Sequence, residues 1–180
     1  MSWLRQQVGR FDGRVDSAFD ALRGRSVADR VFYAASELGD FSLIWLLLGA
    51  LRGLRSERDR RAAVRLAVGL GVESVLVNVV VKSFFRRVRP ETTFDRPRHL
   101  RIPRTSSFPS GHATSAFSAA SLLADGDSLW PLYYAVAAVV AASRVHVKIH
   151  HASDVVAGAA LGVVLGRALR RLSPLAPRPD

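Results

Sequence analysis

This 180-residue chain contains no cysteine, very little lysine and no long apolar run. Without cysteine it forms no disulfide bond and carries no thiol chemistry. Lysine occurs only at Lys82 and Lys148, so nearly all of the positive charge comes from arginine. The chain also has no run of about 20 consecutive apolar residues, the usual length for crossing a bilayer. Its apolar runs reach that length only when polar residues at their ends are included.

The charge balance indicates an anionic partner. A formal net charge of +11 is typical of proteins that meet nucleic acid, anionic lipid or phosphate groups. Nucleic-acid binding requires basic residues on a solvated face with interleaved aromatic residues. Here the arginines flank apolar segments instead, so we expect no nucleic-acid partner.

The apolar segments predict a single domain of the all-α class. They are the residue ranges 41–51, 66–81, 107–124, 129–143 and 155–169. Residues 135–142 read Ala-Val-Ala-Ala-Val-Val-Ala-Ala and leave no polar face, whereas helices of a soluble bundle are amphipathic. We therefore predict a membrane-embedded helical bundle of about five spans. A soluble helical bundle is the alternative.

The N-terminal region is too charged to span a bilayer. Phe11, Val15, Phe19 and Leu22 recur at helical spacing, with charged residues on the other faces. This pattern predicts an amphipathic helix, which either lies in the membrane interface or packs on the bundle. Ser26 with Asp29 three residues later predicts a capping box that opens a second helix.

Three segments follow from this division. Residues 1–38 are predicted as the amphipathic, interfacial helices, residues 39–172 as the helical bundle, and residues 173–180 as a disordered, proline-rich tail.

Two features inside the bundle predict how its helices face one another. Glu73 lies within an apolar run, and a carboxyl there should point to the bundle interior, as a satisfied core group or as support for a site. Gly158, Gly162 and Gly166 follow at a spacing of four and predict close helix packing.

Three polar stretches stand out from this apolar background, at residues 82–90, 109–112 and 143–154. Among their cations are Lys82, Arg89 and Arg144. Phosphoryl transfer needs cations where negative charge gathers on the phosphate oxygens, and the planar arginine fork binds two such oxygens at once. The stretches therefore predict a phosphate-transfer site.

The other residues of these stretches fit the same chemistry. Ser110 is placed to cap a helix whose first N–H groups, at Gly111 and His112, would face an anion. His150 and Asp154 are four residues apart, so the carboxylate can orient the imidazole and leave its other nitrogen free to attack phosphorus. His112 is then available to protonate the leaving oxygen. This chemistry requires no metal or cofactor.

Together the stretches resemble the signature of the type-2 phosphatidic acid phosphatase superfamily. The matching residues are Lys82…Arg89-Pro90, Pro109-Ser110-Gly111-His112 and Ser143-Arg144…His150…Asp154, with no position missing. The resemblance implies a phosphohistidine intermediate, with His150 as nucleophile, Asp154 as its orienting partner and His112 as general acid. It also implies a phosphate-binding set, namely Lys82, Arg89, Ser110, Gly111 and Arg144.

The resemblance also implies a substrate class. We expect a lipid phosphate at the bilayer edge: a polyprenyl phosphate or diphosphate, phosphatidic acid or phosphatidylglycerol phosphate. The short, arginine-rich chain resembles small bacterial members of the family that act on polyprenyl-linked substrates. Because the superfamily also includes soluble acid phosphatases, a non-lipid substrate is the alternative, and a non-catalytic basic membrane or nucleic-acid-binding protein is a third reading.

Helix parity predicts the sidedness of the site. The loops at 52–65 and 125–128 fall on one side, and the stretches 82–106 and 144–154 on the other. Arginine-rich loops stay in the cytoplasm, so residues 52–65 are expected there. The active site is then on the extracytoplasmic face of the cell membrane.

Three further residues of the third stretch need an assignment. His146, His151 and Lys148 lie beside His150, and clustered histidines can indicate a metal. No set of carboxylates or cysteines at ligand spacing accompanies them. We therefore predict loop residues near the pocket, with His151 in contact with substrate, and no metal.

Overall fold

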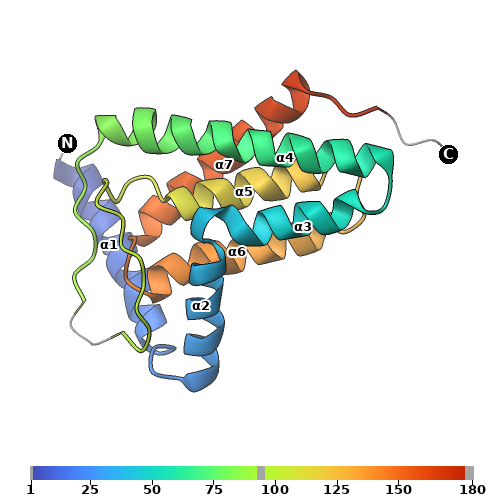
Figure 1. Ribbon diagram of the computed structural model, residues 1–180. Helices are drawn as coiled ribbons and strands as arrows, with labels where there is room; N and C mark the ends of the chain where they lie inside the picture. The colour runs from blue at the N-terminus through green and yellow to red at the C-terminus, as the bar shows by residue number, and fades with distance from the viewer. Residues whose placement is uncertain (1, 93–95, 177–180) are drawn as a thin grey trace.

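The computed structural model describes residues 2–92 and 96–176, and over these residues it is helical without strands. The α-helices are α1 (Ser2–Asp20), α2 (Ser26–Leu38), α3 (Leu43–Gly53), α4 (Glu57–Val75), α5 (Gly111–Leu123), α6 (Trp130–His146) and α7 (Ala152–Leu172) (Figure 1). A π-helical turn (Leu76–Val80) and a 3-10 turn (Val81–Phe84) extend α4. The predicted all-α class is confirmed.

Helix α5 is the centre of the bundle. It packs against α4, α6 and α7, and α3 completes the bundle beside α4 (Figure 1). Most α5 side chains are alanine or serine, so the neighbouring helices approach it closely. Larger side chains, among them Trp45, Leu66 and Leu122, fill the core towards α3 and α4.

The glycines of α7 make the closest of these contacts. A Cβ at Gly158 would lie 2.5 Å from the Ser110 carbonyl oxygen, and one at Gly166 would lie 2.8 Å from the Ser118 carbonyl oxygen. A Cβ at Gly162 would overlap the backbone of α5 in the same way. The glycine spacing therefore does pack one face of α7 directly on the α5 backbone.

The outer face of the bundle is apolar. Five exposed valines follow one another along α4 and its extension: Val64, Val68, Val72, Val75 and Val79. Such a continuous stripe is unfavourable in water and typical of a surface that faces lipid. Conversely, Glu73 on the same helix is buried, which confirms its predicted inward orientation.

Two helices are long and apolar enough to cross a bilayer, among the residues described. They are Glu57–Phe84 and Ala152–Leu172. Helices α2 and α3 add a third span if they are counted together, although the chain bends by 71° between them. Helices α3, α5 and α6 are each shorter than the about 20 residues that a helix needs to cross a bilayer.

The N-terminal helices pack onto the bundle. Val15 and Phe19 of α1 contact the core between α5, α6 and α7, whereas Trp3 and Leu4 near its start are exposed. The predicted capping box of α2 is wrong: Arg25 is the N-cap residue and no side chain caps the helix. Asp29 instead accepts a hydrogen bond from the Gly24 N–H, and its carboxylate lies 2.8 Å from His146 Nε2.

The ends of the predicted segments differ from the structure in two places. The expected basic loop at 52–65 is mostly helical, because α3 continues to Gly53 and α4 starts at Glu57. Of the tail, Ser173 to Ala176 is non-helical. Residues 177–180 lie outside the described residues, so disorder of the tail stays a prediction.

A buried ion-pair cluster closes the bundle end that contains the α3–α4 and α5–α6 turns. Arg52 donates to Asp59 at 2.8 Å, and both side chains are almost fully buried. Arg65 and Arg170 pair with Asp125 at 2.7 and 3.0 Å. These arginines therefore tie helices together and are not simply a solvated basic loop.

We predict that Gly162→Ala destabilises the protein, because its Cβ would meet the α5 backbone and would force α7 outward. Overpacking of this kind costs about 1–3 kcal/mol. Gly71→Ala on α4 is the matched control, since a Cβ there meets no atom within 4 Å and alanine favours the helix. Thermal unfolding in detergent measures both. An unchanged Tm for Gly162→Ala would contradict the close contact.

Candidate active site

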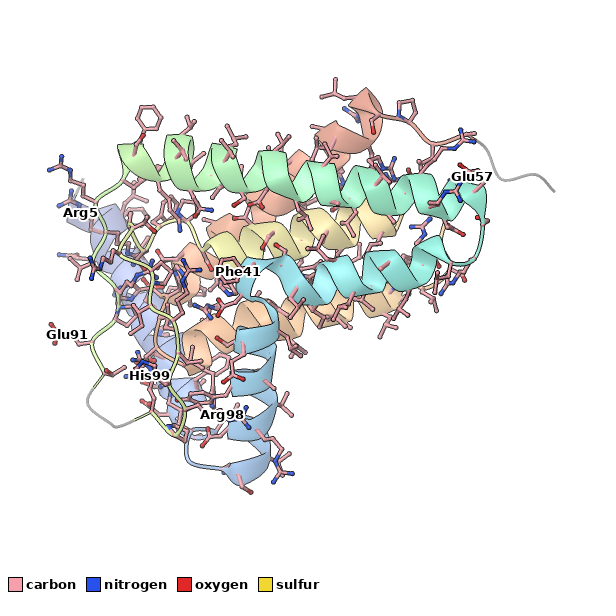
Figure 2. All side chains as sticks on the ribbon, in the orientation of Figure 1. Arg5, Phe41, Glu57, Glu91, Arg98 and His99 are labelled. Carbon is pink, nitrogen blue, oxygen red and sulfur yellow. The ribbon has the colours of Figure 1, made fainter. Side chains whose placement is uncertain are left out.

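The three polar stretches meet at the bundle end opposite the ion-pair cluster. Figure 2 shows Glu91, Arg98 and His99 of the long connection at the same end as Arg5 of α1, with Glu57 at the other end. The Ser110 N–H donates to the Asp154 carbonyl at 3.0 Å and joins the second and third stretches. Arg89 donates to the Ile149 carbonyl at 3.0 Å and joins the first to the third.

His150 and Asp154 are buried where the α6–α7 connection enters α7. His150 Nδ1 lies 3.7 Å from Asp154 Oδ2, which is longer than a hydrogen bond. Ser107 fills the gap: its hydroxyl donates to Asp154 Oδ2 at 2.6 Å and lies 3.4 Å from His150 Nδ1. The same carboxylate oxygen accepts the His151 N–H at 2.9 Å. The carboxylate is thus held in place behind the imidazole.

His150 is a neutral imidazole in this environment. Burial lowers the pKa of His150 to about 3, and the charges of Arg144 and Arg89 act in the same direction, against the opposing effect of Asp154. A neutral ring keeps a free lone pair on one nitrogen. Nε2 is the nitrogen that lies 3.1 Å from Arg89 Nη1, so a phosphate bound by Arg89 would lie beside it.

Two of the predicted phosphate-binding residues, Arg89 and Arg144, lie close enough to His150 to act on its charge. Arg89 is anchored by the carbonyls of Pro103 and Thr105, each at 3.1 Å. Arg144 is buried and donates to the Ser36 hydroxyl, while its Nε and Nη2 have no hydrogen-bond partner within the described part of the chain. An unpartnered buried guanidinium edge is costly, and a phosphate oxygen would satisfy it.

The start of α5 provides the remaining phosphate contacts. Ser110 caps the helix, as predicted, and accepts the Ala113 N–H at 3.4 Å. The N–H groups of Gly111 and His112 belong to the first turn and have no acceptor within the helix. A Cβ at Gly111 would lie 3.6 Å from Lys82 Nζ, so the lysine ammonium faces the helix start closely.

A cavity of about 360 Å³ opens in front of these groups. Its lining includes Lys82, Gly111, His112 and His150, with Glu73 deeper on α4. This volume accommodates a phosphate and a small head group. Of the eight site residues predicted from sequence, four line this cavity: Lys82, Gly111, His112 and His150.

His112 has a partner that the sequence did not reveal. Its Nε2 lies 3.0 Å from Asp40 Oδ1, at the bend between α2 and α3. Phe41 and Ser42 follow with φ values of 52° and 59°, a left-handed conformation that is strained for non-glycine residues. The Arg101 guanidinium covers the Phe41 ring at 4.6 Å. Together these residues form the mouth of the cavity.

Of the residues beside His150, Lys148 and His151 lie in the connection between α6 and α7, as predicted, whereas His146 does not. His146 is not a loop residue: it ends α6, is buried against Phe19 and Phe32, and pairs with Asp29. Lys148 binds Asp16 of α1 at 3.1 Å. The ring of His151 lies 3.2 Å from the Val88 carbonyl oxygen. Among the described residues, no group of three or more histidines and carboxylates has the geometry of a metal site.

Sequence reasoning missed Ser107, Asp40 and Arg87. Arg87 donates to Asp154 Oδ1 at 2.6 Å, yet it occupies no position of the family signature. All three lie in connections whose path depends on tertiary contacts. No spacing rule could therefore have singled them out.

A buried neutral histidine, backed by a carboxylate and facing a cationic pocket at a helix start, defines a helical phosphate-transfer enzyme. The PAP2 superfamily matches residues 62–177, and the chain belongs to this superfamily. The protein is accordingly a phosphatase.

Known relatives agree with this assignment. The chain is 36% identical over 139 residues to the decaprenylphosphoryl-5-phosphoribose phosphatase of Mycolicibacterium smegmatis, covering 77% of this chain and 75% of the relative. It is 34% identical over 134 residues to the Mycobacterium tuberculosis protein of the same name, covering 73% and 72%. The fold is similar to the crystal structure of a transmembrane PAP2 type phosphatidylglycerolphosphate phosphatase from Bacillus subtilis. The TM-score is 0.69 at 24% identity, with 92% of this chain and 86% of that chain covered. With its apolar outer face, the chain is a membrane phosphatase.

The depressed pKa of His150 predicts a pH-dependent stability. Unfolded histidine has a pKa of about 6.5, so between about pH 6.5 and pH 3 the unfolded state binds a proton that the folded state excludes. Stability therefore falls as the pH drops through this window. We expect a smaller loss of Tm from about pH 7 to pH 5 in His150→Gln than in the wild type, because the glutamine has no proton to bind.

The control for this measurement is His99→Gln, because His99 is exposed on the long connection. It should lose as much Tm as the wild type over the same pH range. Equal losses in the wild type, His150→Gln and His99→Gln would contradict burial of a neutral His150.

Proposed function

We propose that this membrane phosphatase hydrolyses the terminal phosphate of a polyprenyl-linked lipid through a phosphohistidine intermediate. The observation that carries the proposal is the neutral, buried His150, with Nε2 facing the cations of the cavity and Asp154 behind Nδ1. A nucleophile in this position would join all three sequence stretches in one reaction.

In the first step, His150 Nε2 attacks the phosphorus atom. An N–P bond forms and the P–O bond to the lipid breaks, while His112 donates a proton to the departing oxygen. Arg89, Lys82 and Arg144, with the N–H groups at the start of α5, stabilise the charge on the phosphate oxygens. Asp154 stabilises the positive imidazole that results.

In the second step, water attacks the phosphohistidine. His112, which has lost its proton, accepts one from this water, so that a P–O bond forms as the N–P bond breaks. Inorganic phosphate leaves and His150 is neutral again. Burial lowers the pKa of His112 to about 4, and Asp40, 3.0 Å from His112 Nε2, opposes this shift. Asp40 and the negative phosphate would together favour the protonated form of His112 that the first step needs.

The proposed lipid class rests on two observations. The relatives whose names mention decaprenylphosphoryl-5-phosphoribose match three quarters of the chain. The cavity of about 360 Å³ holds a head group, whereas a long polyprenyl tail would lie along the apolar outer faces of α3 and α4. A soluble acid phosphatase would have no need of these exposed apolar faces.

A panel of purified lipid phosphates tests the proposal. We expect phosphate release to be fastest from polyprenyl phosphates that carry a phosphorylated sugar, and slower from phosphatidic acid and phosphatidylglycerol phosphate. His150→Ala should lower kcat by at least about 10⁴-fold without a change in fold, because the covalent intermediate cannot form. Rapid quenching in alkaline detergent with labelled substrate should trap a phosphohistidine, which is stable in base and labile in acid, in the wild type alone.

His112→Ala separates the two catalytic roles. It should reduce turnover of lipid substrates more than turnover of p-nitrophenyl phosphate, whose leaving group needs no proton. Rapid turnover by a folded His150→Ala variant would disprove the histidine nucleophile. Preference for a water-soluble phosphate over every lipid would disprove the lipid class.

We further propose that the active site faces the extracytoplasmic side of the cell membrane. Arg52 and Arg65 are buried in ion pairs, so they do not count as loop charges. Exposed arginines nevertheless remain at that end of the bundle: Arg55, Arg60, Arg61, Arg167 and Arg171. Exposed positive charge beside a span favours the cytoplasmic side.

Cysteine labelling measures this orientation, since the chain has no native cysteine. We expect His99→Cys, on the active-site end, to react with a membrane-impermeant maleimide in intact cells. Leu54→Cys, 83% exposed at the α3–α4 turn, should react only after permeabilisation. The reverse pattern would place the active site in the cytoplasm.

A further inference from the structure

Arg87 connects two carboxylates that belong to different parts of the chain. Its Nη1 donates to Asp154 Oδ1 at 2.6 Å and to the Ser153 hydroxyl at 2.8 Å. Its Nη2 donates to Asp12 Oδ2 at 2.7 Å. The planar guanidinium is well suited to such a bridge, because its N–H groups point in fixed, different directions.

On the Asp154 side, the bond from Arg87 gives the second carboxylate oxygen, Oδ1, a hydrogen-bond donor. Ser107 and the His151 N–H both bind Oδ2, so Arg87 is the charged partner of the other oxygen. A carboxylate held at both oxygens has one orientation towards His150. Its negative charge is also compensated, although Asp154 is fully buried.

On the other side, Asp12 belongs to α1. It is 8% exposed and accepts hydrogen bonds from the Ser153 N–H at 2.8 Å and from the Ser153 hydroxyl at 2.9 Å. These bonds dock α1 on the first turn of α7, where Asp154 also lies. The docked helix leaves Trp3, Leu4 and Phe11 exposed, so it presents an apolar edge away from the site.

We propose that Asp12 and Arg87 are positioning residues, through which α1 holds the Asp154 carboxylate against His150. The proposal rests on the roles of His150 and Asp154 in the proposed function. It gives the amphipathic N-terminal helix a task in catalysis: α1 fixes Arg87, Arg87 fixes Asp154, and Asp154 orients the nucleophile. Neither Asp12 nor Arg87 lines the cavity that holds Lys82, Gly111 and His112. Both line a second cavity, of about 380 Å³, which His150 also borders.

We expect Arg87→Gln to lower kcat by about 10- to 100-fold, the usual effect of losing a partner that orients a functional group. KM should change by less than about threefold, because the phosphate-binding residues remain in place. Arg87→Lys should recover part of kcat, since an ammonium keeps the charge but cannot bridge both carboxylates. Added guanidinium ion should raise kcat of Arg87→Gln and leave the wild type unchanged.

Asp12→Asn tests the link to α1. It should lower kcat by about three- to tenfold in the wild type, but by less than about twofold in the Arg87→Gln background, because both changes break one chain of contacts. Arg86→Gln is the matched control. Arg86 is the exposed neighbour of Arg87, and within the described residues its side chain makes no ion pair, so kcat should stay at the wild-type value.

The outcomes separate this proposal from the proposed function. A wild-type kcat in folded Arg87→Gln, with His150→Ala inactive, would overturn the positioning role alone. A rise in KM at constant kcat would also overturn it, because that pattern belongs to substrate binding. If Arg87→Gln does not fold, the Asp12→Asn and Arg87→Lys variants test the proposal instead. An unchanged kcat in both variants would disprove it, and a reduced kcat at constant KM would support it.

Discussion

The direct contact between α5 and α7 is the constraint on which the active site depends. Without side chains at Gly158, Gly162 and Gly166, α7 lies on the backbone of α5. This contact places the start of α5 beside the start of α7, and the Ser110 N–H then binds the Asp154 carbonyl. The anion-binding helix start and the histidine–carboxylate pair are consequently held at a fixed separation by backbone, which has little freedom to move.

Around this contact, burial decides which groups are charged. His150 is enclosed among cations, and its desolvation keeps the imidazole neutral at physiological pH. Asp154 is equally buried but has charged and polar donors on both oxygens. The same protein interior thus keeps a neutral imidazole next to an anionic carboxylate, which is the combination that the proposed attack on phosphorus requires.

The long connection between α4 and α5 completes the site from outside the bundle. Through Arg89 it contributes a cation beside the nucleophile, through Ser107 a bridge between His150 and Asp154, and through Arg87 a bond to α1. Loops supply function when a rigid scaffold holds them, and here the scaffold is the α5–α7 pair. At the other end of the bundle, the ion pairs around Arg52 and Asp125 join helices to one another.

Much of this protein was determined by its sequence alone, since the relevant signals are local. Helix periodicity, the glycine spacing of α7 and the order of the three polar stretches predicted the all-α class, close packing of α7 and four of the residues that line the cavity, namely Lys82, Gly111, His112 and His150. Tertiary structure alone decided that Ser107 stands between His150 and Asp154, that Asp40 faces His112, and that His146 belongs to the α2 interface. It also decided that Asp12 of α1 reaches the site through Arg87. The physical reason is the same in each case, because these contacts join segments that are far apart in the chain. Whether a polar side chain meets solvent, a partner or His150 depends on how the helices pack and not on its neighbours in sequence.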